Sequence, residues 1–127
     1  MSSARRFFAE NVAIAATTAV SMETLLKTAG WGYERNLTTN AISTTPSLDS
    51  FEGNRAVLLP AADVFVGHDE FVSNAAAAGP PRLYKGALAK AGEKFVLEDF
   101  CRGMVDPSQV WFYSTGSTTA DLVFEGF

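Results

Sequence analysis

The sequence is poor in the residues that carry most catalysis and metal binding. Its 127 residues include a single cysteine, Cys101, and a single histidine, His68. One cysteine excludes an internal disulfide and a multi-cysteine zinc site, and a reducing compartment fits. His68 stands beside Asp69 and Glu70, but adjacent residues point in different directions, and no second His or Cys can complete a soft-metal site. We predict a polar turn here and no bound metal.

Motifs for the common enzyme mechanisms are also missing. The chain has no G-x-x-x-x-G-K-[ST] phosphate loop, no G-x-G-x-x-G fingerprint and no G-x-S-x-G nucleophile elbow. Cys101 and His68 could supply a nucleophile and a base, but a lone cysteine between Phe100 and Met104 is more typical of a small buried hydrophobic residue. We expect a protein that is not an enzyme and that uses no cofactor.

Charge and long apolar runs are scarce as well. Charged residues make up 19% of the chain, the formal net charge is −4, and the basic residues are scattered. Such a chain does not attract nucleic-acid backbones. No stretch reaches the 18 or more apolar residues of a membrane span. The apolar run 12–20 is short and Glu10 and Asn11 separate it from Arg5 and Arg6, so we expect no signal peptide and synthesis in the cytoplasm.

The pattern that remains is typical of a β-rich domain. Hydrophobic residues make up 47% of the chain, enough for the core of one domain. Short apolar segments alternate with Gly, Pro, Ser and Asn, which predicts an all-β fold, a small antiparallel β-sandwich or a jelly-roll-like barrel. The segment 55–59 is expected to be a buried strand. The other strands are expected at 11–20, 62–67, 82–86, 94–98, 110–114 and 120–125.

One short helix is predicted near the start of this domain. Ser21 is a suitable N-cap, Glu23 falls in the first turn, and Lys27 lies near the end. Gly30 is a natural residue just beyond the C-terminus of a helix. We expect the helix to run from about Met22 to Ala29.

Two segments fall outside the strand pattern. Residues 1–10 are interpreted as an N-terminal arm, so that the single domain spans 11–127, and Phe7 and Phe8 are candidate anchors of the arm. Residues 31–54 are rich in Ser, Thr and Asn and are interpreted as a long loop. A loop of this length in a compact domain is usually functional or ordered by a partner.

The last predicted strands, 110–114 and 120–125, are expected to form a hairpin. In the second strand the apolar residues share one face, while Asp121 and Glu125 flank Val123 on the other. An apolar hairpin at a sheet edge needs cover from the arm, from the long loop or from another chain. Trp111 and Tyr113 either pack under the domain's own loops or belong to a subunit interface.

The order of these segments resembles that of small virion proteins of tailed bacteriophages. The resemblance is carried by SMETLL at 21–26, RAVLLPAADVFVG at 55–67, RLYKGALAKAGEKFVLED at 82–99 and VDPSQVWFYSTGSTTADLVFEGF at 105–127. It covers about residues 20–30 and 55–127. It is a likeness of layout and includes neither the arm nor the long loop.

The resemblance implies a capsid decoration (cement) protein, located on the virion surface and bound to the major capsid protein or another virion protein. A homo-oligomer is expected, with a trimer favoured. The first candidates for contact with neighbours are Phe7, Phe8, Trp31 and Tyr33, and Tyr113 and Phe127 come second. Two alternatives stay open: a head-fibre, neck or tail component, and a sugar-binding β-sandwich in which Trp31 and Tyr33 stack on the sugar.

Overall fold

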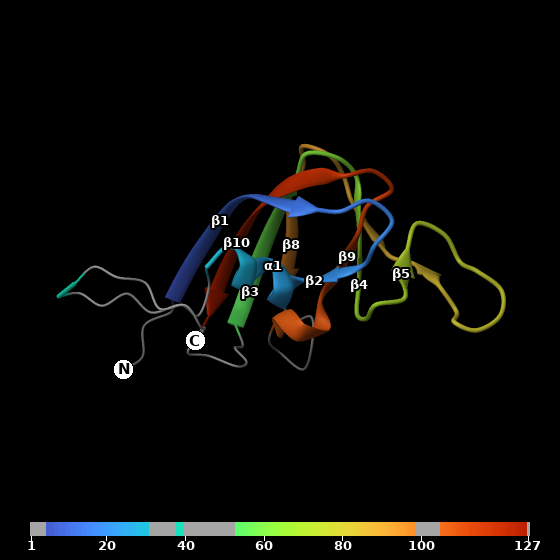
Figure 1. The fold of residues 1–127 in the computed structure, drawn as a ribbon, viewed down its shortest axis with the longest axis horizontal. Helices are drawn as coiled ribbons and strands as arrows, with labels where there is room; N and C mark the ends of the chain where they lie inside the picture. The colour runs from blue at the N-terminus through green and yellow to red at the C-terminus, as the bar shows by residue number, and fades with distance from the viewer. Residues whose placement is uncertain (1–4, 31–37, 40–52, 99–104, 127) are drawn as a thin grey trace.

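The computed structural model of the protein describes residues 5–30, 38–39, 53–98 and 105–126. Within these ranges the chain forms two four-stranded antiparallel sheets, a parallel two-stranded pair and one α-helix (Figure 1). The two sheets share one hydrophobic core, and each contributes one of its faces to it. The predicted all-β sandwich with one short helix is confirmed.

The first sheet has the strand order β1-β10-β3-β8. Its strands are β1 (Arg5–Ile14), β10 (Thr118–Gly126), β3 (Gly53–Pro60) and β8 (Phe95–Glu98). β10 thus lies inside the sheet, with β1 on one side and β3 on the other. The register of β1 shifts between Ala9 and Val12, and Asn11 has a φ of 54° there. This irregularity is a β-bulge, which lets β1 stay paired with β10 on both sides of it.

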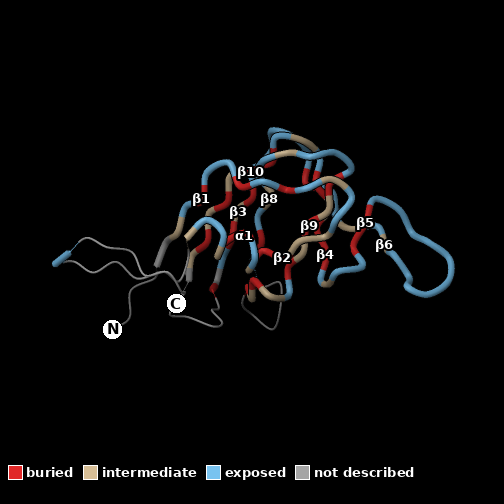
Figure 2. The backbone as a smooth tube through the Cα atoms, viewed as in Figure 1, coloured by how far each residue is buried: buried red, intermediate tan, exposed pale blue. Residues whose placement is uncertain are grey.

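The second sheet has the order β2-β9-β4-β7. Its strands are β2 (Val20–Ser21), β9 (Trp111–Tyr113), β4 (Val64–Gly67) and β7 (Ala87–Ala89). Between β4 and β7 the chain leaves the sandwich and forms a lobe, residues 71–85, which holds the parallel strands β5 (Val72–Ser73) and β6 (Tyr84–Lys85). Most of the lobe is exposed (Figure 2).

The core is built from alternate residues of both sheets. In β10 the predicted alternation is confirmed: Ala120, Leu122 and Phe124 are buried, and the residues between them are half-buried. In β3, which was expected to be buried throughout, Val57 is half-buried and Leu59 is exposed. β3 therefore has one face in the core and one face outside.

Helix α1 (Met22–Thr28) forms where it was predicted. Ser21 caps it, because its Oγ accepts the N–H of Thr24 at 3.1 Å. Ala29 is the C-cap, and Gly30 follows with a φ of +108°, a conformation that favours glycine. A single 3₁₀ turn, η1 (Pro107–Gln109), precedes β9.

The expected C-terminal hairpin is wrong, because β9 and β10 belong to different sheets. Residues 114–117 carry the chain from the second sheet to the first. Ser114 forms a bridge with Ala16 next to this crossing, and its Oγ donates to the carbonyl of Gly116 at 2.6 Å. β10 is covered by β1 and β3, so no apolar sheet edge arises there.

The expected arm is also wrong over residues 5–10, which form the first part of β1. Phe7 is in register with Phe124 and packs against the core. The long loop expected at 31–54 lies almost entirely outside the described residues, apart from 38–39 and the start of β3.

Candidate functional site

A row of four apolar residues crosses the outer face of the first sheet. The register places Phe8 opposite Val123, Val123 opposite Val57, and Val57 opposite Val96. Phe8 is 59% exposed and Val96 is 44% exposed, while the two valines between them are half-buried. Single exposed apolar residues are common, but a contiguous row across four strands forms a patch. We call these four residues the outer apolar row.

A row of charged residues borders the outer apolar row, two positions along each strand. Glu125 on β10 is in register with Arg55 on β3, and Arg55 is in register with Glu98 on β8. The Nε of Arg55 lies 3.2 Å from Oε1 of Glu98, and both side chains are exposed. We call these three residues the charged row. The sign of the charge alternates from strand to strand, so the row forms a polar border beside an apolar patch.

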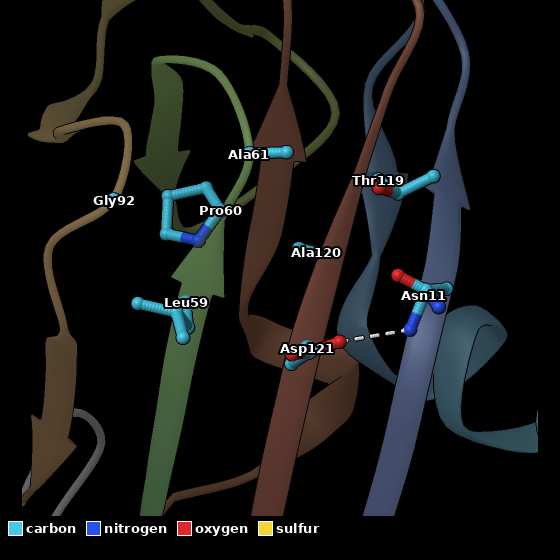
Figure 3. Close-up of a pocket in the computed structure, with 8 residues that line it drawn as sticks. All are labelled: Asn11, Leu59, Pro60, Ala61, Gly92, Thr119, Ala120 and Asp121. Atoms are coloured by element: carbon cyan, nitrogen blue, oxygen red, sulfur yellow. Dashed lines mark hydrogen bonds between the residues drawn. The ribbon is translucent and has the colours of Figure 1, made fainter.

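On the other side of the outer apolar row lies a hollow of about 260 Å³ (Figure 3). Leu59 lines it and lies two residues from Val57 on β3. Asp121 lines it from β10, and its Oδ1 accepts the N–H of Asn11 at 2.9 Å, at the bulge of β1. The hollow is smaller than most sites for drug-sized ligands.

The outer face of the second sheet carries another group of apolar side chains. Tyr113 is in register with Phe65, and Phe65 is in register with Leu88, which is 48% exposed. We call these three residues the second apolar surface. The side chains of Phe71 and Leu83, in the lobe between β4 and β7, are also exposed. Because the two sheets share one core, this surface and the outer apolar row lie on opposite sides of the sandwich.

The hydroxyl of Tyr84 fixes the base of the lobe. It accepts the backbone N–H groups of His68 at 2.9 Å and Asp69 at 3.1 Å. The rings of His68 and Tyr84 stack with their centroids 4.8 Å apart. Burial raises the pKa of Tyr84 above its ordinary value of 10.0, although the two backbone hydrogen bonds act in the opposite direction. His68 thus belongs to a polar turn, in keeping with the prediction.

We expect Tyr84→Phe to lower the free energy of unfolding by about 1 kcal/mol at neutral pH, because two backbone N–H groups lose their acceptor. A raised pKa means that the folded protein favours the neutral phenol. The neutral phenol of Tyr84 therefore contributes to the free energy of unfolding. This contribution is complete below pH 10.0 and is lost as the pH rises through the pKa of Tyr84 in the folded protein. The difference in the free energy of unfolding between the wild type and the variant should therefore become smaller above pH 10.0, as measured by urea unfolding at a series of pH values. A gap that stays constant with pH would contradict this assignment.

The described part of the chain holds no group of three or more His, Cys, Asp and Glu side chains that could bind a metal ion. In the same ranges, no helix is long and apolar enough to cross a membrane. Cys101, which the sequence offered as a candidate nucleophile, lies outside the described residues.

The predicted contact residues do not lie together in the structure. Phe8 is on the outer face of the first sheet, and Tyr113 is on the outer face of the second. Phe7 faces the core, so it is not available as an anchor. Trp31, Tyr33 and Phe127 lie outside the described residues.

Sequence reasoning missed five of the surface residues: Val57, Phe65, Leu88, Val96 and Val123. The alternation within β8 does contain a signal, because Leu97 is buried and Val96 must then point the other way. What the sequence does not contain is the register, which joins residues from distant segments into one row.

Comparison of the chain with family models, with curated proteins and with solved structures gives no match. The two apolar surfaces and the layout of the sequence are therefore the observations that bear on function.

Proposed function

We propose that the protein is a non-enzymatic structural protein of a tailed-phage virion, a capsid decoration (cement) protein that binds and stabilises the assembled head. The supporting observation is the presence of two apolar surfaces on opposite sides of one small sandwich. A protein that holds neighbours together needs two separate adhesive surfaces, and apolar patches with polar borders are typical of protein interfaces. The resemblance in sequence layout suggests the kind of assembly.

Such a protein acts through binding free energy alone. Packed DNA repels itself and pushes the capsid shell outward. A protein that binds the assembled lattice, and not the free subunits, shifts the equilibrium toward the lattice. At a free concentration of one hundred times Kd, this linkage contributes about 2.7 kcal/mol for each occupied site. The partners in this proposal are the major capsid protein or another virion protein, together with further copies of the chain.

We expect the purified protein to sediment with heads of the phage that encodes it, and not with free capsid subunits. Leu88→Ser should weaken this attachment roughly tenfold, because it replaces an exposed side chain of the second apolar surface with a polar one. The measurement is co-sedimentation with heads that lack the protein, over a series of protein concentrations.

Thr115→Ala is the matched control, since Thr115 is exposed in the crossing between the sheets and belongs to neither apolar surface. The control should bind as the wild type does. Binding to purified tails in place of heads would contradict the head assignment, and binding to neither particle would contradict the virion role.

A further inference from the structure

We infer that the outer face of the first sheet binds the same face of a second copy of this chain, in a pair related by a two-fold axis that runs along the strands between β10 and β3. This inference deepens the proposed function, on which it rests for its biological setting. It assigns the outer apolar row to self-association and leaves the second apolar surface for the lattice.

The charged row supports this orientation. A two-fold axis along the strands places β10 of one copy opposite β3 of the other. Positions along the strand direction stay the same, so the charged rows of the two copies face each other. Glu125 of one copy then faces Arg55 of the second copy, and the symmetry repeats this contact. The charges are therefore complementary across the interface, as in specific protein interfaces.

The outer apolar row matches itself under the same symmetry. Val123 of one copy faces Val57 of the other, and Phe8 faces Val96. The four residues and their symmetry mates form a continuous apolar layer between the two sheets. Face-to-face sheets pack about 10 Å apart through side chains of this kind.

Other symmetries fit the face less well. A two-fold axis across the strands, through the outer apolar row, brings the charged row onto the row of Asp121 and Leu59. Glu125 would then face Asp121, a contact between two carboxylates, and Arg55 would face Leu59. A three-fold ring uses two different patches on each subunit, whereas this face is complementary to itself. The face thus favours a two-fold pair over the trimer expected from the sequence.

The size of the face fits a reversible pair. Four strands about 4.8 Å apart and up to about 30 Å long present roughly 500 Å² on each copy. A pair then buries roughly 1,000 Å², near the lower end of the range for specific interfaces. We expect an equilibrium between monomer and dimer that shifts with concentration.

The test is the solution mass of the full chain, measured by light scattering from micromolar to submillimolar concentration. Arg55→Glu and Glu125→Arg should each weaken self-association at least tenfold, because both copies then present like charges at the facing positions. An equimolar mixture of the two variants should restore the dimer, since each variant supplies the charge that the other lacks. Mixing does not change the contacts inside one chain. A dimer that forms only in the mixture must therefore depend on contacts between the two variants.

Three results would overturn the inference: a wild type that stays monomeric, a mass that grows to a trimer, or a mixture that does not restore the dimer. Circular dichroism of each variant checks the fold, and Val96→Ser, which leaves the charged row intact, should also weaken the dimer. Capsids take no part in this test. A dimer that does not attach to heads would refute the proposed function and leave the assignment of this face standing.

Discussion

Deletion of residues 1–9 is expected to abolish the native fold. Phe7 and Ala9 pack against the core, and residues 5–9 pair with residues 122–126 of β10. The burial of one large apolar side chain contributes about 1.5–3 kcal/mol, and each backbone hydrogen bond about 1 kcal/mol. The total loss, about 5 kcal/mol or more, is comparable to the stability of an ordinary domain. The deletion also leaves residues 122–126 of β10 as an open edge, which promotes aggregation.

Circular dichroism, urea unfolding and gel filtration would show the effect as loss of the cooperative transition or of soluble protein. Deletion of residues 1–4 is the matched control, because it keeps all of β1 (Arg5–Ile14) and should unfold as the full chain does. A chain without residues 1–9 that unfolds at the wild-type urea concentration would show that the first half of β1 contributes nothing. The sequence alone predicted that outcome, since it assigned these residues to an arm.

Gly86→Ala is expected to destabilise the protein by about 3 kcal/mol, or roughly 10 °C in Tm. Gly86 lies where the lobe returns to the second sheet. A Cβ there would be 2.6 Å from Cγ2 of Val72, 2.7 Å from the carbonyl oxygen of Val66 and 2.9 Å from its nitrogen. The backbone of β4 cannot move away without disturbing the second sheet. Thermal unfolding followed by circular dichroism measures the change.

Gly116→Ala provides the control for this substitution. No atom lies within 4 Å of a Cβ added at Gly116, so the change in stability should stay within about 0.5 kcal/mol. Similar melting temperatures for the two variants would mean that the contacts around Gly86 are looser than the structure shows.

The sequence predicted helix α1 and the inner face of β10, because short stretches of neighbouring residues specify both features. The cap at Ser21 and the glycine at Gly30 fix the ends of α1, and the alternation of Ala120, Leu122 and Phe124 identifies the inner face of β10. These features depend on neighbouring residues and on the periods of helices and strands.

Two errors arose where a local signal has more than one structural meaning. Residues 5–10 were assigned to an arm, but they belong to a strand that continues through the bulge at Asn11 to Ile14. The segment between the strands expected at 110–114 and 120–125 was predicted to be a hairpin turn, but residues 114–117 connect two different sheets. Whether two successive strands pair is decided by packing over the whole core, and that information is not local.

The residues of the two candidate surfaces were only partly predictable, because a local pattern does not show which strands align. Phe8 and Tyr113 attract notice as aromatic residues in exposed contexts. Val57, Val96 and Val123 are ordinary strand residues that gain significance when β3, β8 and β10 align in register. A surface assembled from single residues of several strands has no motif in the sequence.

The central place of β10 has a consequence for synthesis on the ribosome. β10 is the last of the described strands to be made, yet it is the strand that joins β1 to β3. Until residues 118–126 emerge, β1 has no partner strand in the first sheet and β3 has one unpaired edge. We expect folding to begin after these residues leave the exit tunnel, and to proceed slowly, because its key contacts join the two ends of the described chain.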